Sequence, residues 1–177
     1  LLQPDPTGPM GVDYLICETT YGDVDRIEAS AERRRAVLRA EVEGAMRRGG
    51  ALLIPSFAVE RAQELISDLT ALMLAGEVPF APIHVDSPLA TRATAIFRTH
   101  AADLENGAQL VDGITSRHVH FTETVEQSRA LAQVRGFHII IAASGMCEAG
   151  RIRHHLKNWI AQDSATLLLV GYQAAGT

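Results

Sequence analysis

The residues most suited to chemistry form a small-residue turn followed by two arginines. Ser144 and Gly145 end an apolar run, and Gly150 precedes Arg151 and Arg153 where a segment with helical spacing begins. Free backbone N–H groups and the positive end of a helix dipole favour an anion at such a turn, and guanidinium groups match the geometry of phosphate. The same residues would also suit a plain strand-to-helix turn with solvated arginines, and they leave both interpretations open.

Other strand ends deliver polar side chains to the same edge of the predicted sheet. These side chains are Glu18, Ser56, Asp86, Ser87 and Gln173. Ligands of open α/β sheets bind outside the carboxyl ends of the strands, so the pattern predicts a phosphate-rich ligand held by hydroxyl groups, N–H groups and arginines. Each of the residues also has a structural interpretation, because carboxylates and serines at these places commonly cap helices.

The elements that position these groups are short apolar runs alternating with helical segments. This alternation predicts an α/β fold, a parallel, doubly wound (Rossmann-like) sheet with helices on both faces and right-handed crossovers. The expected strands are residues 13–17, 51–55, 82–86, 139–143 and 165–170, with weaker candidates at 109–111 and 118–121. The expected helices are residues 30–48, 59–75, 88–98, 124–134 and one from 152, the first capped by Ser30 and ended by Gly49.

Composition limits the class of protein. The chain has 177 residues, 47% of them hydrophobic, and a net charge of −5. This predicts one globular domain, no membrane span and no protein that coats nucleic acid non-specifically, although a local basic groove stays compatible with it. The two cysteines, Cys17 and Cys147, lie far apart, which favours reduced thiols and a cytoplasmic location. The start at Leu1 and the end just after a strand suggest a piece of a longer protein.

Several well-known catalytic motifs are missing from the sequence. It contains no HxHxDH, no HExxH, no G-K-[ST] loop and no GxGxxG, so neither a self-contained metal site nor a nucleotide-binding fingerprint is predicted. His154 and His155 are adjacent, but neighbours on a helix point about 100° apart and cannot face one ion. His155 shares a helix face with Ile152 and Trp159, which favours a packed histidine over a ligand.

Five motifs in this order together resemble the β-CASP family of metallo-β-lactamase-fold nucleases. They are ETTYGD from position 18, IPSFAVERAQEL from 54, VDSPLA from 85, SGMCEAGRIRHHL from 144 and VGYQAAGT from 170. The family consists of zinc-dependent RNA-processing enzymes with DNA-processing relatives. In these enzymes the β-CASP domain is an α/β insertion that closes over a site with two zinc ions, and RNA runs through the cleft between the two domains.

The resemblance assigns expected roles residue by residue. Glu18 matches an acidic residue that supports the metal site by contacting its ligands, and it is the expected catalytic residue. The positions expected to contact nucleic acid are Ser56, Arg61, Ser87, Ser144, Gly145, Met146, Gly150 and Arg151. None of these is expected to bind metal. The sequence departs from the family at Glu60, where a glycine before Arg61 is usual, and the added negative charge is expected to weaken a phosphate contact there.

The resemblance also implies how the chain fits into a larger protein. Residues 1–22 would be a lead-in and the end of the metallo-β-lactamase-fold domain, and residues 23–177 the β-CASP domain. The zinc-binding motifs are absent from this sequence, so the two zinc ions belong to the full-length parent and none is expected to bind here. The expected partners are single-stranded RNA and the metallo-β-lactamase-fold domain of the same parent; a homodimer is left open.

The resulting hypothesis is that the chain is the RNA-clamping domain of a zinc-dependent ribonuclease that hydrolyses RNA phosphodiester bonds. This chain alone is expected to be inactive. One alternative is a module that binds nucleic acid or protein, from a parent lacking its zinc ligands. Another is a small-molecule phosphohydrolase or nucleotide-binding domain, which the missing fingerprints disfavour. The choice between RNA and DNA stays open.

Overall fold

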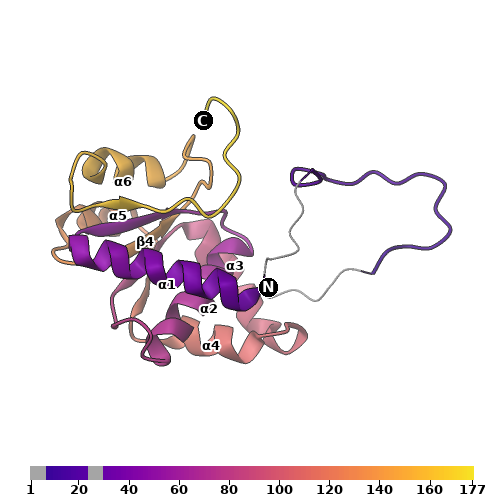
Figure 1. Ribbon diagram of the computed structural model, residues 1–177, viewed down its shortest axis with the longest axis horizontal. Helices are drawn as coiled ribbons and strands as arrows, with labels where there is room; N and C mark the ends of the chain where they lie inside the picture. The colour runs from indigo at the N-terminus through magenta and orange to yellow at the C-terminus, as the bar shows by residue number, and fades with distance from the viewer. Residues whose placement is uncertain (1–6, 24–29) are drawn as a thin grey trace.

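The computed structural model describes residues 7–23 and 30–177 and shows a parallel five-stranded sheet with helices on both faces (Figure 1). The strand order is β3-β2-β4-β1-β5. The strands are β1 (Ala51–Pro55), β2 (Ile83–Asp86), β3 (Val119–Phe121), β4 (His138–Ala142) and β5 (Thr166–Leu167). The α-helices are α1 (Ala31–Arg48), α2 (Arg61–Leu74), α3 (Pro88–Thr99), α4 (Gly107–Thr115), α5 (Val125–Ala130) and α6 (Ile152–Trp159). The predicted doubly wound α/β fold is confirmed.

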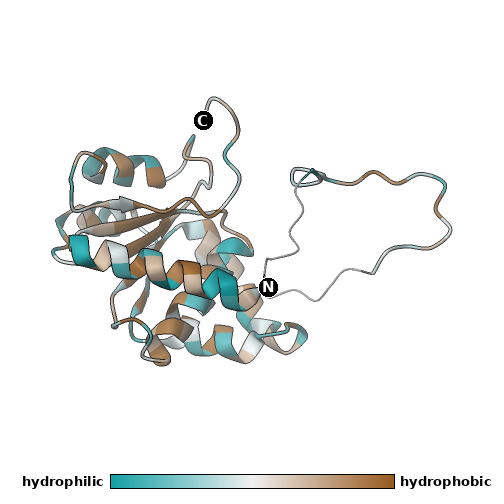
Figure 2. Cartoon of the chain, in the orientation of Figure 1, coloured by the Kyte–Doolittle hydropathy of each residue, from teal (hydrophilic) through white to brown (hydrophobic). Residues whose placement is uncertain are grey.

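The two faces of the sheet follow from alternation along the central strands. Leu52, Ile54, Ile139 and Ile141 point to the face covered by α1 and α2, in a core that also takes in residues of β2. Leu53 and Ile140 point to the other face, where they pack with Ile152 and Trp159 of α6. Because both faces of β1 and β4 are covered, every residue of the two strands is buried, and all but His138 are apolar (Figure 2).

Local signals define the first helix as the sequence predicts. The Ser30 hydroxyl accepts a hydrogen bond from the Arg33 N–H at 3.2 Å, which caps the N-terminus of α1. Gly49 ends the helix in the left-handed conformation, with φ 79° and its N–H donating to the Ala45 carbonyl. The chain then enters β1 at Ala51, so only Gly49 and Gly50 separate the helix from the sheet.

Three expected strands differ from the structure. Residues 13–17 form no strand and have exposed side chains, because no neighbouring strand among the described residues takes up their backbone groups. Residues 109–111 lie in helix α4, which buries Leu110 and packs its Gly113 against Thr70 of α2. The expected strand at 165–170 is shortened to Thr166–Leu167, because β5 is an edge strand that pairs with β1 alone.

The remaining ranges agree to within a few residues. Helix α5 is followed by a 3-10 turn, η2 (Leu131–Gln133), and a second 3-10 turn, η1 (Ala101–Asp103), joins α3 to α4. The first six residues of the expected lead-in lie outside the described residues. In the described part of the chain, no helix combines the length and the apolar character needed to cross a membrane.

Candidate functional site

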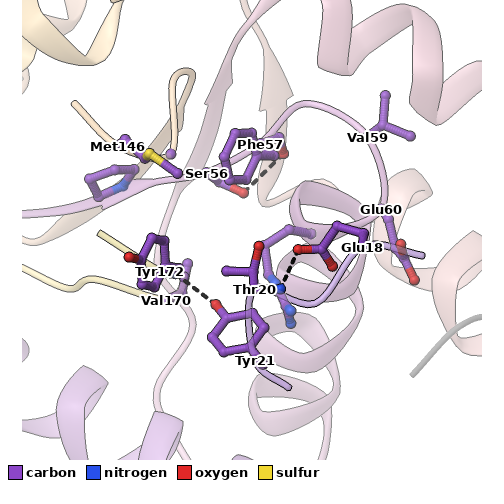
Figure 3. A pocket seen from close by; sticks show the side chains of 14 residues that line it. Glu18, Thr20, Tyr21, Ser56, Phe57, Val59, Glu60, Met146, Val170 and Tyr172 are labelled. Atoms are coloured by element: carbon purple, nitrogen blue, oxygen red, sulfur yellow. Dashed lines mark hydrogen bonds between the residues drawn. The ribbon is translucent and has the colours of Figure 1, made fainter. Parts of the chain in front are cut away.

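A pocket of about 380 Å³ opens at the carboxyl ends of β1 and β4 (Figure 3). We call it the strand-end pocket. Its lining comes from distant parts of the chain and consists of Glu18, Thr20, Tyr21, Pro55, Ser56, Phe57, Val59, Glu60, Arg61, Gly145, Met146, Val170, Gly171 and Tyr172. It therefore brings together five of the residues singled out from the sequence, namely Glu18, Ser56, Arg61, Gly145 and Met146.

One wall of the pocket consists of Ser56, Phe57 and Gly145. The Ser56 N–H donates to the Ala142 carbonyl at 3.0 Å, which ties the turn after β1 to the end of β4. The Phe57 ring lies against Gly145, since a Cβ on that glycine would come within 3.0 Å of the ring. The ring is 50% exposed, so it offers an aromatic face beside the pocket.

The charged groups of the pocket are two carboxylates and one guanidinium. Arg61 Nη1 donates to Oε2 of the buried Glu64 at 2.6 Å, and the Arg61 side chain remains 38% exposed. Glu60, just before it, has φ 67° and ψ −65°, a positive-φ backbone conformation that an L-residue with a side chain rarely adopts. This explains why a glycine suits that position. In Figure 3, Glu60 and Glu18 lie at one side of the pocket, with Met146 and Tyr172 at the other.

The ETTYGD motif reaches the pocket through a tyrosine pair. The Tyr172 N–H donates to the Tyr21 hydroxyl oxygen at 2.8 Å, and the two rings pack edge to face with centroids 6.0 Å apart (Figure 3). Glu18 Oε1 accepts a hydrogen bond from the Thr20 N–H at 2.6 Å, and hydrogen bonding by Thr20 lowers the pKa of the Glu18 carboxyl. Glu18 is thus an ionised, exposed carboxylate at neutral pH.

The other predicted contacts lie away from this pocket, around a buried carboxylate. Asp86, at the end of β2, is fully buried. It is contacted by Arg151 Nη1 at 2.7 Å, His155 Nε2 at 2.6 Å, Ser128 Oγ at 2.6 Å and Thr122 Oγ1. We call these five residues the Asp86 network.

The network determines the state of Asp86 and of Arg151. Burial alone would raise the pKa of Asp86, but hydrogen bonds from His155, Ser128, Thr122 and Arg151 outweigh it and hold the pKa well below its usual range. Arg151 also donates to the carbonyls of Thr122 and Glu123, at 3.2 and 2.8 Å, and its side chain is only 19% exposed. Much of the hydrogen-bonding capacity expected for a phosphate is therefore used inside the protein.

Ser87, Ser144 and Gly150 occupy structural positions in the same region. The buried Ser87 caps α3, its hydroxyl accepting from the Ala90 N–H at 3.2 Å. Ser144 exchanges backbone hydrogen bonds across the turn with Ala149 and Cys147. Gly150 has φ 75°, and a Cβ there would sit 2.2 Å from the Ala143 carbonyl oxygen. None of the three lines the strand-end pocket.

Sequence reasoning placed Asp86 at a strand end but missed its role. Arg151 and His155 are four residues apart, which puts them on one side of α6, and an acidic residue ends a neighbouring strand. That combination is the signal that could have indicated a buried ion pair. The prediction of a packed His155 is confirmed, since its side chain is 2% exposed.

The described residues do not gather a metal-binding group. Nowhere in residues 7–23 and 30–177 do three or more histidine, cysteine, aspartate or glutamate side chains come together as a metal ion would need. Cys17 and Cys147 are free thiols, and burial raises the pKa of the Cys147 thiol. We therefore assign no step of a reaction to a metal held by these residues.

Fold and pocket together define a parallel α/β domain with its ligand-accessible surface at the carboxyl edge of the sheet. Residues 62–177 match the family model of the Beta-Casp domain, and the chain belongs to this family. It is 36% identical to ribonuclease TTHA0252 of Thermus thermophilus over 98% of its length, and 30% identical to an RNase J-like protein of Methanocaldococcus jannaschii over 99%. It is also 31% identical to endoribonuclease ysh1 of Schizosaccharomyces pombe over 96%. The chain spans 40%, 41% and 22% of these three relatives, respectively.

Proposed function

We propose that this chain is the RNA-binding domain of a zinc-dependent ribonuclease with a metallo-β-lactamase-fold partner domain. Membership of the Beta-Casp family supports the proposal, as do relatives whose names are ribonuclease and endoribonuclease. The whole protein would hydrolyse RNA phosphodiester bonds in the cytoplasm. This domain would hold the RNA strand while the partner domain supplies the metal.

The observation that carries the proposal is the convergence of motif residues in the strand-end pocket. Residues from four segments, 18–21, 55–61, 145–146 and 170–172, all but Thr19 and Ala58, line one opening although the segments are far apart in the sequence. The pocket lies at the carboxyl edge, where parallel α/β sheets bind their ligands. Side chains that serve packing alone would not need to meet around an open cavity.

The character of the lining indicates how RNA would be held there. The exposed rings of Phe57 and Tyr172 are suited to stacking with bases, a contact that tolerates any sequence. Gly145 allows the Phe57 ring to lie against the backbone beside the opening. Arg61 is the single cation of a lining that also contains two glutamates, so this pocket would bind RNA with little dependence on salt.

Zinc enters the proposal only through the parent protein. Two zinc ions would supply a hydroxide nucleophile and polarise the scissile phosphate when bound by the partner domain. Glu18, ionised and exposed, is the residue of this chain that would face that site and orient a metal ligand. Its hydrogen bond from Thr20 would fix the direction of the carboxylate.

Binding of a fluorescent single-stranded RNA, measured by anisotropy, tests the proposal. We expect Phe57→Ala to weaken binding about tenfold, since one base stack contributes about 1 to 3 kcal/mol. Phe80→Ala removes an aromatic ring of similar exposure from outside the pocket and should leave binding unchanged. Equal affinity of the wild-type chain and Phe57→Ala would contradict the proposed site, and no binding of RNA by the wild type would contradict the proposed function.

Catalysis is tested separately with metal. We expect the chain supplied with zinc to leave RNA intact over the same period as a chelator-treated control, because the described residues gather no metal-binding group. Cleavage that depends on added zinc would show that this chain alone forms a catalytic site.

A further inference from the structure

A second cavity, of about 300 Å³, lies between α5 and α6. We call it the α5–α6 groove. It is lined by Val125, Ser128, Arg129, Arg151, His154, His155, Lys157 and Asn158. The helical spacing explains this lining, since 151, 154, 155 and 158 follow one face of α6 and 125, 128 and 129 follow one face of α5. Two helix faces thus form opposite walls.

The charge of the groove is opposite to that of the chain. Three of its eight lining residues are arginine or lysine, two are histidine and none is acidic. Asp86 offsets the charge of Arg151, so Arg129 and Lys157 carry the positive charge that no buried carboxylate offsets. The whole chain has a net charge of −5, and the strand-end pocket is lined by two glutamates and one arginine. A cavity that collects cations on an acidic protein is suited to an anionic ligand.

The base of the groove is fixed by the Asp86 network. Arg151 is held by Asp86 and by the Glu123 carbonyl, so its position does not depend on a ligand. The neighbouring His155 is buried, and its Nδ1 has no hydrogen-bond partner among the described residues. A preorganised base reduces the entropy lost when a ligand binds.

The rim of the groove carries groups that remain available. Arg129 and Lys157 are exposed, and within the described chain the side chains of Lys157 and His154 form no hydrogen bond or ion pair. Arg129 interacts electrostatically with Glu126 on its own helix, a contact open to solvent. These side chains can close on an anion placed between them, since long cationic side chains reorient at small cost.

We propose that the α5–α6 groove binds a phosphate group, and that the phosphate belongs to an RNA strand extending beyond the strand-end pocket. The RNA part rests on the proposed function. One segment connects the two sites, because Gly145 and Met146 line the pocket and Arg151 lines the groove six residues after Gly145. The pocket would stack bases, and the groove would supply the cationic contact that the pocket lacks.

The test compares RNAs of two lengths in salt titrations. The short RNA is a dinucleotide, which can occupy the pocket alone, and the long one has about twelve nucleotides, enough to extend beyond the pocket. We expect the double variant Arg129→Gln/Lys157→Gln to bind the long RNA about tenfold more weakly. It should also lower the slope of log affinity against log salt by about 0.7, since one phosphate is no longer neutralised. Binding of the short RNA should not change.

The control is a double variant with the same loss of charge elsewhere. Arg47 and Arg98 are exposed on α1 and α3, away from both cavities, and Arg47→Gln/Arg98→Gln should match the wild type for both RNAs. Equal affinity of the groove variant and the wild type for the long RNA would overturn the inference and leave the proposed function standing.

A titration with inorganic phosphate tests whether the groove binds free phosphate as well as the phosphate of an RNA strand. Phosphate added to the chain should shift the side-chain NMR signals of His154 and His155, and the shift should vanish in Arg129→Gln/Lys157→Gln. If the wild type binds neither RNA, the proposed function fails, and a phosphate-dependent shift would then assign the groove to free phosphate. No shift and no effect of the groove variant on RNA binding would overturn the site altogether.

Discussion

The strand-end pocket and the Asp86 network lie at the same edge of one sheet, but they differ in how far their charged groups are exposed and paired within the protein. In the pocket, Arg61 is 38% exposed and has one carboxylate partner. In the network, Asp86 is fully buried and is contacted by four side chains. The loop after β4 joins the two regions, so the same segment serves an open cavity on one side and a closed cluster on the other.

The position of each strand explains the difference. β1 lies beside the short edge strand β5, so little backbone covers the space beyond its end. β2 lies between β3 and β4, and α5 and α6 supply the residues that cover its end. A buried charge there requires partners, because an unpaired one costs several kcal/mol. Polar residues at strand ends are therefore accessible to a ligand only where the neighbouring elements leave them uncovered.

The largest expected effect comes from removing the central carboxylate of the network. Asp86→Ala would leave the buried His155 and the largely covered Arg151 without their anionic partner. We expect the free energy of unfolding to fall by about 3 to 5 kcal/mol, measured by urea denaturation at pH 7. Asp163→Ala, at an exposed aspartate, should change it by less than about 0.5 kcal/mol. Similar values for the two variants would show that the network contributes little to folding.

Two glycines of one loop allow the regions to be compared directly. Gly150→Ala places a Cβ 2.2 Å from the Ala143 carbonyl oxygen at φ 75°, which should cost about 2 kcal/mol or more. Gly145→Ala meets the half-exposed Phe57 ring at 3.0 Å and the Phe57 backbone nitrogen at 3.3 Å, and should cost less than about 1 kcal/mol because the ring can move. Thermal unfolding measures both variants, and Gly145→Ala should also weaken RNA binding by displacing the ring. Equal destabilisation would mean that the Phe57 side of the loop is as rigid as the Ala143 side.

These expectations show which parts of the fold the sequence can predict. The limits of α1 follow from Ser30 and Gly49, because capping depends on residues adjacent to the helix. The conformation of residues 109–111 depends on distant packing: a Cβ on Gly113 would lie 2.5 Å from Thr70 Oγ1, so α4 approaches α2 closely only with glycine there. The apolar run at 13–17 had the composition of a strand, but a strand also needs a partner, and the sequence does not indicate one.

The same limit applies to the site. The motif around Arg151 predicted a bound anion. In the structure the anion that contacts Arg151 is the side chain of Asp86, which lies 65 residues earlier in the chain. Pattern and spacing identify a guanidinium at a helix start, but they do not show which carboxylate reaches it in three dimensions. Glu60 is the reverse case, because the positive φ at this position agrees with the glycine that the family resemblance led us to expect.

The dependence of stability on pH distinguishes the contribution of His84 from that of Asp86. Burial, and then the nearby His120 and His138, lower the pKa of His84 to about 4. The folded protein thus favours neutral His84, so its contribution to stability is complete above about pH 6.5 and is lost as the pH falls toward 4. The pKa of Asp86 is also lowered, so its contribution is present above its ordinary value and is lost only below this window.

We therefore expect the wild type to lose about 1 kcal/mol more than His84→Phe between pH 7 and pH 5, a value reduced for partial exposure of the ring. Urea denaturation at the two pH values measures the difference. His100→Gln, at an exposed histidine, should keep the wild-type dependence. A wild-type dependence in His84→Phe as well would assign the loss of stability to other groups.

The smallest expected effect separates charge from strain in the strand-end pocket. Glu60→Gly and Glu60→Ala both remove a carboxylate beside Arg61, so both should bind RNA about two- to threefold more tightly. Only glycine adopts φ 67° without a steric cost of about 1 kcal/mol, although part of this gain is offset by the greater freedom of glycine in the unfolded chain. Glu60→Gly should therefore be about 0.5 kcal/mol more stable than Glu60→Ala in urea denaturation. Equal stability of the two variants would mean that the backbone at position 60 relaxes once the side chain is shortened, and the family's usual glycine would then have to be explained by the ligand and not by the fold.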